Sequence, residues 1–310
     1  MDPARRPGGT GRIAGHEVAR IGYGAMQLEH GTAQEAAVVL RRAIECGVDH
    51  LDTAPFYGGG EVDRRIRAAL APYREDLVIV SKVGAVHVPG GRVPLAAAQK
   101  PAELRAAVES ELAELGLDRI AVVNLRRMDL GPGVLAEGDQ VVDLDDQLAE
   151  MVALRDEGKI GAIGLSAVTP QTLHRALPAG IVCVQNAYSL LDRRCEDMLR
   201  ICAGHGVAWV PFFPLGSAFP GFPKVTDNEV VRRIAGELGA TPAQIGLAWL
   251  LAHSPDILLI AGTRSPAHLR ENLRSGDVAL SPAQLAALDA VPGAGSADGD
   301  GVEAFLDEGR

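Results

Sequence analysis

Eight short runs rich in β-branched residues alternate with eight longer amphipathic stretches along nearly the whole chain. This alternation is typical of βαβ units, in which each helix crosses over a parallel sheet. The predicted strands are residues 21–25, 48–53, 77–82, 120–126, 160–166, 181–185, 208–213 and 257–261. The predicted helices are residues 33–46, 62–70, 101–115, 144–157, 170–177, 195–205, 242–252 and 266–274. Eight such repeats predict a closed (β/α)8 TIM barrel rather than an open sheet.

The segments outside the repeats agree with this interpretation. Residues 10–20 resemble a small β-hairpin, which would lie before the first strand and plug the barrel bottom. No linker or low-complexity block interrupts the chain, so we expect one barrel domain over about residues 13–291 of 1–310. The two ends, residues 1–10 and 292–310, are expected to be flexible tails. Helix starts with Thr or Ser followed by Pro are expected at Thr169, Thr241, Ser265 and Ser281.

Composition argues against several classes of protein. The formal net charge of −10 is unfavourable for nonspecific DNA binding and for an acidic membrane surface. No stretch approaches a membrane span, and the N-terminus lacks the apolar region of a secretory signal. We therefore expect a cytoplasmic protein without nucleic-acid or membrane partners, either a monomer or a small homo-oligomer. Four scattered cysteines show neither metal spacing nor a disulfide framework, and we expect buried free thiols at Cys46, Cys183, Cys195 and Cys202.

Candidate functional residues gather where the predicted strands end. In TIM barrels the chemistry belongs to the C-terminal ends of the strands and to the loops that follow them. Residues from seven different elements fall at this rim: Asp52, Tyr57, Lys82, Arg126, Ser166, Gln185, Phe212 and Gly262. Such consistent sorting of polar and aromatic residues to one rim predicts a site there.

The central group of this rim is an Asp, a Tyr and a Lys at the ends of adjacent strands. A free tyrosine hydroxyl has a pKa near ~10, so Tyr57 needs help to act as an acid at neutral pH. An ammonium at Lys82 would favour the phenolate, and Asp52 would keep the lysine charged and oriented. The alternative is a buried Asp–Lys bridge beside an idle tyrosine. The three residues together favour a proton-donating tyrosine.

The chain resembles the aldo-keto reductase family over nearly its full length. The resemblance rests on the order and spacing of Gly47-Val-Asp-His-Leu-Asp-Thr-Ala-Pro-Phe-Tyr-Gly58, Ile79-Val-Ser-Lys-Val83, Ile163-Gly-Leu-Ser166, Val184-Gln-Asn186, Pro214-Leu-Gly-Ser217 and Gly262-Thr-Arg-Ser-Pro-Ala-His-Leu-Arg-Glu-Asn272. It implies a TIM barrel that binds NADPH in extended form and reduces a carbonyl without a metal. The absence of a Gly-x-Gly-x-x-Gly run between a strand and a helix agrees with this.

The resemblance also implies roles for individual residues. Tyr57 matches the general acid, Lys82 the group that adjusts its pKa, and Asp52 the partner of the lysine. Ser166 and Gln185 match positions that bind the nicotinamide carboxamide, and Phe212 matches the aromatic that stacks on its ring. Leu215, Gly216 and Ser217 match the loop over the pyrophosphate. The adenosine end, where an Arg and a helix N-terminus suit a 2′-phosphate, would use Thr263, Arg264, Ser265, His268, Glu271 and Asn272, with Gly24 and Gly262 in the same cofactor site.

Three positions depart from the family pattern. Arg126 occupies the place where relatives usually carry a catalytic His. An Arg does not shuttle protons at neutral pH, but it can donate hydrogen bonds to a carbonyl oxygen or an anion. Ala167 stands where an Asn usually follows the Ser, and Gly262 where many relatives have a Lys. These last two changes are expected to affect mainly the affinity for the cofactor.

The substrate is less well defined by the sequence. The Gly22–Gln27, Asn124–Arg127 and Val210–Gly216 segments resemble a bacterial subgroup that reduces pyridoxal to pyridoxine with NADPH. Arg126 would pair with the phenolate oxygen beside the aldehyde. Two alternatives stay open, a general aldehyde or ketone reductase and a non-catalytic NADPH-binding sensor or subunit. Retention of Asp52, Tyr57 and Lys82 together argues against the sensor.

Overall fold

The computed structural model describes residues 6–90, 94–131, 133–216 and 223–293. Within these residues, eight strands form one parallel sheet, in the order β11-β10-β9-β8-β5-β4-β3-β12. The strands are β3 (Ile21–Gly24), β4 (His50–Asp52), β5 (Val78–Val83), β8 (Ile120–Arg126), β9 (Ile160–Ser166), β10 (Ile181–Gln185), β11 (Ala208–Trp209) and β12 (Leu259–Ile260). Strands β3, β4, β5 and β11 are buried along their whole length, and the other four have one or two half-buried positions, in line with their largely apolar character.

The sheet closes on itself between its first and last strands. Trp209 of β11 bridges in parallel to Ile257, just before β12. The Trp209 amide donates to the Asp256 carbonyl at 3.0 Å, and the Leu258 amide donates to the Trp209 carbonyl at 2.9 Å. This closure confirms the predicted barrel and satisfies the edge groups that an open sheet would expose.

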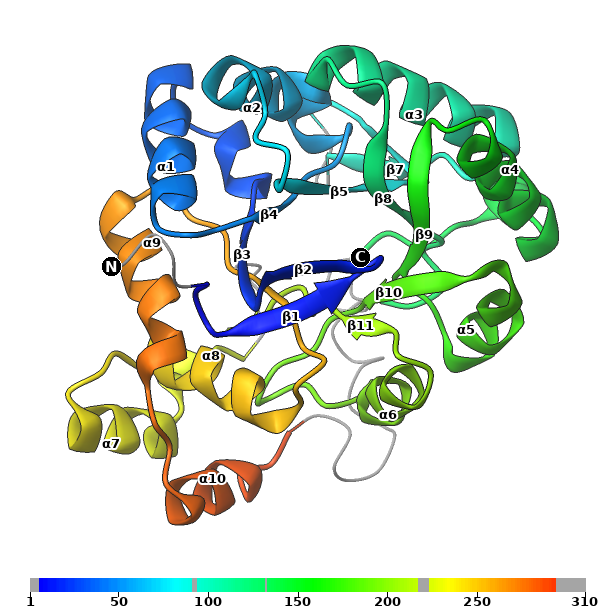
Figure 1. Ribbon diagram of the computed structural model, residues 1–310. Helices are drawn as coiled ribbons and strands as arrows, with labels where there is room; N and C mark the ends of the chain where they lie inside the picture. The colour runs from blue at the N-terminus through cyan, green and yellow to red at the C-terminus, as the bar shows by residue number, and fades with distance from the viewer. Residues whose placement is uncertain (1–5, 91–93, 132, 217–222, 294–310) are drawn as a thin grey trace.

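Helices surround the strands, as Figure 1 shows. They are α1 (Ala33–Glu45), α2 (Glu61–Leu70), α3 (Pro101–Leu115), α4 (Leu144–Asp156), α5 (Pro170–Ala176), α6 (Glu196–Gly204), α8 (Pro242–His253) and α9 (Pro266–Arg274). The predicted Thr-Pro and Ser-Pro starts are confirmed, since each hydroxyl caps its helix at Thr169, Thr241, Ser265 and Ser281. In each case the hydroxyl oxygen accepts from a first-turn amide that would otherwise lack a partner.

A hairpin of β1 (Thr10–Ile13) and β2 (His16–Ala19) crosses one end of the ring of strands in Figure 1. Ile13 and Val18 are buried in a small cluster with residues near the beginnings of the strands, among them Val78 and Ala208. Since these strand beginnings mark the N-terminal end of the barrel, the hairpin plugs its bottom as predicted. The hairpin leaves the C-terminal end of the barrel, where the predicted site residues lie, uncovered.

The structure differs from the predicted elements at several places. Strand β11 ends at Trp209 rather than at residue 213, although Val210 and Phe212 still donate to the Val184 and Asn186 carbonyls. The pairing stops at Phe213, which adopts a left-handed φ of 55°. Two further helices, α7 (Glu229–Leu238) and α10 (Pro282–Asp289), lie outside the eight repeats. A hairpin of β6 (Ala85–His87) and β7 (Leu95–Ala97) rises after β5. The sequence analysis expected a helix start for α10 at Ser281, but it did not predict α7 or the β6–β7 hairpin.

The four cysteines are buried and free, as predicted. No helix in the described part of the chain is long and apolar enough to cross a membrane. Most of the predicted flexible tails, residues 1–5 and 294–310, lies outside the described residues. Arg6, within the predicted N-terminal tail, forms an ion pair of 2.8 Å with Asp49.

Candidate active site

The ends of β4 and β5 bring together the Asp and Lys that the sequence singled out. Lys82 Nζ donates to Asp52 Oδ1 at 2.6 Å and to the Thr53 carbonyl at 2.8 Å. Both side chains are almost fully buried. Burial has the largest single effect on the pKa of Lys82 and lowers it, but the charges and hydrogen bonds of Asp52 and Tyr57 together outweigh burial, so the pKa lies above its usual value. The lysine therefore stays an ammonium inside the barrel.

Tyr57 stands beside this ammonium, at the start of the short helix η2 (Tyr57–Gly60). Lys82 Nζ lies 4.9 Å from the centre of its ring. Burial raises the pKa of the Tyr57 phenol and outweighs the opposing effect of Lys82, so the net shift is upward. The Lys82 charge does lower the pKa of Tyr57, as expected from the sequence, but burial, which the sequence did not reveal, has the larger effect. Tyr57 is therefore protonated at neutral pH and is able to donate.

Gln185 reaches the same carboxylate from β10, on another side of the barrel. Its Nε2 donates to Asp52 Oδ2 at 2.6 Å. Asp52 thus accepts from Lys82 on one oxygen and from Gln185 on the other. The resemblance implied a contact between Gln185 and a nicotinamide carboxamide; here the amide faces Asp52 and fixes the orientation of the carboxylate.

Arg126 and Ser166 end the paired strands β8 and β9 and are partners in register. The Arg126 guanidinium carbon lies 5.8 Å from the centre of the Phe212 ring. Arg126 Nε and Ser166 Oγ are buried and have no hydrogen-bond partner among the described residues. Buried polar atoms without partners are costly, so these two atoms stand out at the rim.

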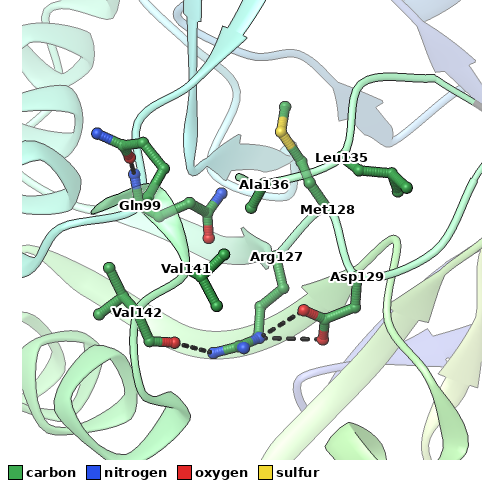
Figure 2. A pocket seen from close by; sticks show the side chains of 9 residues that line it. Gln99, Arg127, Met128, Asp129, Leu135, Ala136, Val141 and Val142 are labelled. Carbon is green, nitrogen blue, oxygen red and sulfur yellow. Dashed lines mark hydrogen bonds and ion pairs between the residues drawn. The ribbon is translucent and has the colours of Figure 1, made fainter. Parts of the chain in front are cut away.

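The neighbouring Arg127 points into a different environment, shown in Figure 2. It lines a cavity of about 140 Å³ beneath the loop after β8. Its guanidinium bonds Asp129 at 3.0 Å, Gln147 at 2.6 Å and the Val142 carbonyl at 3.2 Å. These bonds anchor the loop. Of the two adjacent arginines, only Arg126 is available at the rim.

Gly24 and Gly262 explain why β3 and β12 approach so closely at this rim. A Cβ atom on Gly262 would lie 2.4 Å from the Gly24 carbonyl oxygen, and one on Gly24 would lie 2.5 Å from the Ile260 carbonyl oxygen. Because side chains do not fit at these contacts, a Lys at position 262 would require the backbone to move. The close approach of β3 and β12 at this rim therefore requires Gly at position 262.

We expect Gly262→Ala to lower the free energy of unfolding by about 1–3 kcal/mol, because the added methyl overlaps the Gly24 carbonyl. The matched change Gly236→Ala in α7, where nothing lies within 4 Å of the added Cβ, should raise it by up to about 1 kcal/mol. Urea denaturation measures both. Equal effects at the two sites would contradict the close-approach argument.

The predicted adenosine end lies where α9 begins. Tyr23 donates its hydroxyl to the Thr263 carbonyl at 2.6 Å, and Ser265 caps the helix by accepting from the His268 amide at 3.3 Å. Arg264 is exposed beside this turn. Glu271 accepts from Thr241 at 2.6 Å and is thereby tied to α8. A groove of about 340 Å³ runs along this side, with lining residues Gln244, Ala267, Arg270, Glu271 and Arg274.

Arg270 and Arg274 were not among the predicted site residues. They stand four positions apart on one face of α9, a spacing visible in the sequence, and they add positive charge to the groove. His268 is exposed on the same helix and Asn272 is half-buried. This end of the site is therefore more basic than the predicted residues alone imply.

The predicted pyrophosphate loop is only partly within the described residues. The Leu215 carbonyl accepts from the Val225 amide at 3.1 Å. Gly216 adopts a left-handed φ of 87°, and a Cβ atom there would lie 2.2 Å from the Pro223 carbonyl oxygen. Ser217 lies outside the described residues. The two ends of the loop are thus held together beside α8.

Comparison with known proteins shows the family of this chain. The model of the aldo/keto reductase family matches residues 20–292. The chain belongs to the aldo/keto reductase family. This oxidoreductase is 43% identical over 282 residues to pyridoxine 4-dehydrogenase of Escherichia coli, covering 88% of this chain and 95% of that protein. It is 32% identical over 292 residues to an uncharacterized oxidoreductase of Schizosaccharomyces pombe, covering 91% and 89% of the two chains.

A solved aldo-keto reductase shares the fold at lower identity. The enzyme of Klebsiella pneumoniae in complex with NADPH superposes with a TM-score of 0.75 at 27% identity, covering 90% of this chain and 93% of that one.

Ala167, one of the three positions that depart from the family pattern, adopts a left-handed φ of 52°. An Asn, which relatives usually carry there, adopts this conformation more readily than Ala does. The departure at position 167 therefore has a cost in backbone strain.

Proposed function

We propose that this aldo-keto reductase transfers a hydride from NADPH to an aldehyde, with Tyr57 as the general acid, and that pyridoxal is its substrate. The observation that carries the proposal is the buried Asp52–Lys82 pair beside the Tyr57 phenol. A salt bridge needed only for stability would not require a protonated phenol at the barrel mouth. Asp52, Lys82 and Tyr57 meet at the end where barrel enzymes carry out their chemistry.

The residues at the rim fit NADPH. The Ser166 hydroxyl, buried and without a partner in the described part of the chain, suits the amide of a nicotinamide ring, and the half-buried Phe212 ring suits its face. Arg264 and the first amides of α9 suit a 2′-phosphate, which favours NADPH over NADH. The solved relative in complex with NADPH supports the same cofactor. When bound, NADPH supplies the hydride.

The side chains of this chain supply the proton and hold the charges. Tyr57 donates its hydroxyl proton to the oxygen of the carbonyl as negative charge develops there. Lys82 stabilises the phenolate that remains, because its ammonium lies beside the ring. Asp52 keeps Lys82 charged, and Gln185 fixes Asp52. Each of these side chains thus orients or stabilises the one next to it, from Gln185 through to Tyr57.

Arg126 supports the choice of substrate. Pyridoxal carries a phenolate oxygen beside its aldehyde, and a guanidinium can donate two hydrogen bonds to such an oxygen. Arg126 is poised for this contact, with a buried Nε that lacks a partner among the described residues. The 43% identity to a pyridoxine 4-dehydrogenase points to the same substrate.

The deciding experiment follows NADPH consumption by the purified protein with pyridoxal and with a panel of simple aldehydes. Selective turnover of pyridoxal would support the full proposal. Turnover of the simple aldehydes alone would favour a broad-specificity aldehyde or ketone reductase. Tight NADPH binding without turnover of any carbonyl would favour a non-catalytic sensor or subunit and would overturn the proposal.

We expect Arg126→Ala to lower kcat/KM for pyridoxal by roughly 10- to 100-fold, the usual cost of losing a hydrogen bond to a charged group. Steady-state kinetics measure the effect. An aromatic aldehyde without the neighbouring oxygen is the control substrate, and its kcat/KM should fall less. Arg126→Lys, which keeps the charge but loses the planar fork, should lie between the wild type and Arg126→Ala. Unchanged turnover of pyridoxal in Arg126→Ala would contradict the role of Arg126.

A further inference from the structure

Two buried carboxyl groups lie behind the Asp52–Lys82 pair, on the outer face of the barrel wall. Asp63 belongs to α2 and Glu111 to α3, and neither residue is exposed to solvent. Thr53 Oγ1 donates to Asp63 Oδ1 at 2.6 Å, and the Ser81 hydroxyl donates to Glu111 Oε1. The proposed mechanism uses neither carboxyl group, and burying both is costly.

These carboxyl groups are joined to the active site through one residue each. Side chains alternate between the two faces of a strand, so Ser81 faces the helices while Lys82 faces the barrel interior. The Thr53 carbonyl accepts from Lys82 Nζ at 2.8 Å, and Ser81 Oγ accepts from the Lys82 backbone amide at 2.6 Å. Lys82 is therefore held from behind by the same two residues that bond Asp63 and Glu111.

The remaining oxygens of the pair lack partners. Asp63 Oδ2 and Glu111 Oε2 are buried and accept no hydrogen bond from the described residues. The charged groups that face Asp63 are Lys82, Glu114 and Arg64, and those that face Glu111 are Asp63, Lys82 and Asp52. Two carboxylates in this setting repel each other, so they do not both ionise at neutral pH.

The pKa values of both groups agree with this picture. Burial raises the pKa of Asp63 to about 7, against the opposing hydrogen bond from Thr53 and the charge of Lys82. Burial, followed by the charge of Asp63, raises the pKa of Glu111 well above its usual value. As the pH rises through neutrality, negative charge therefore appears behind Lys82.

We propose that Asp63 and Glu111 act as a pair of positioning residues whose loss of a proton places a negative charge behind Lys82 and makes Tyr57 harder to ionise. The pair deepens the proposed function and rests on it. A negative charge near Lys82 offsets part of the ammonium charge that Tyr57 experiences, so the phenol becomes a weaker acid. The pair makes catalysis sensitive to pH near neutrality, without touching substrate or cofactor.

The test compares the wild type with Asp63→Asn, Glu111→Gln and the double variant, which keep the size of each side chain but remove its charge. The wild-type kcat for carbonyl reduction should fall through an inflection near neutral pH. Asp63→Asn should displace that inflection, because the group that titrates there is gone and only Glu111 is left to titrate. Glu111→Gln should leave it near its wild-type position, because Glu111 is still protonated while Asp63 ionises. The double variant should lose the inflection. Glu109→Gln, an exposed position on α3 paired with Lys159, is the matched control and should leave the profile unchanged.

A second readout requires no substrate. The ionisation of Tyr57 is followed by the ultraviolet absorbance difference between each protein and its Tyr57→Phe counterpart. In the double variant Tyr57 should ionise roughly one pH unit lower than in the wild type. If Tyr57 ionised at the same pH in the wild type and in the double variant, with NADPH binding intact, the proposed role of the Asp63–Glu111 pair would be overturned even if the enzyme proves active. If the wild type turns over no carbonyl while Tyr57 still ionises at lower pH in the double variant, the proposed function would be overturned and the effect of the Asp63–Glu111 pair on Tyr57 would stand. If the double variant does not fold, the shift in Glu111→Gln decides in the same way.

Discussion

Tyr57→Phe should lower kcat for carbonyl reduction by about three orders of magnitude, the range expected when a general acid is removed. Phe keeps the ring and its edge contact with Phe56, whose centre lies 5.2 Å away. The variant loses only the hydroxyl that donates the proton, so its affinity for NADPH should stay near that of the wild type. Single-turnover kinetics and a fluorescence titration with NADPH measure the two effects separately.

Tyr73→Phe makes the same chemical change at a structural tyrosine, whose hydroxyl donates to the Leu115 carbonyl at 2.8 Å. Turnover should survive there, with at most a loss of about 1 kcal/mol of stability. If Tyr57→Phe retained turnover, another group would have to supply the proton. If it lost NADPH binding, the phenol would belong to the cofactor site rather than to the proton path.

Lys82→Met should abolish measurable turnover and also destabilise the fold. The phenolate left by Tyr57 loses the neighbouring ammonium, so proton transfer becomes unfavourable. Asp52, only 2% exposed, is left with Gln185 as its side-chain donor and carries a buried charge without a counterion. Removing one partner of a buried ion pair typically costs about 3–5 kcal/mol. Urea denaturation of Lys82→Met and the wild type measures this loss.

The double variant Lys82→Met, Asp52→Leu separates the two effects. Removing the stranded carboxylate should recover a large part of the stability, while turnover stays lost. Lys159→Met, which breaks exposed ion pairs with Glu109 and Glu157, is the matched control and should have little effect on stability. Equal losses for Lys82→Met and Lys159→Met would show that the Asp52–Lys82 pair is not the buried, tightly coupled unit described above.

The sequence predicted the barrel because its evidence is local and repeated. Eight alternating segments, capped helix starts and an N-terminal hairpin each have a signature within a few residues of chain, and the structure confirms all three. Placement of Asp52, Lys82, Arg126 and Ser166 at one rim follows from the same logic. Parallel strands of a closed barrel all end on the same side.

What the sequence left out depends on contacts between distant segments. The segments that hold α7 and the β6–β7 hairpin lack the alternation that marked the eight repeats, and for α10 the sequence revealed only the start at Ser281. Gln185 was predicted to face a ligand, and only the barrel geometry turns its amide toward Asp52, which lies 133 residues earlier. Glu111 did have a local signal, since it interrupts the buried stripe Leu104, Val108 and Leu115 of α3. The stripe did not reveal that Asp63 lies nearby.

The sequence by itself thus determined the architecture, the family and the side of the barrel on which the site lies. It did so because periodicity, caps and strand ends are properties of neighbouring residues. The tertiary structure alone decided the upward pKa shift of Tyr57, the close approach of Gly24 to Gly262, and the Asp63–Glu111 pair behind Lys82. These depend on how much water and how many charges surround a group, and only the packed barrel sets both.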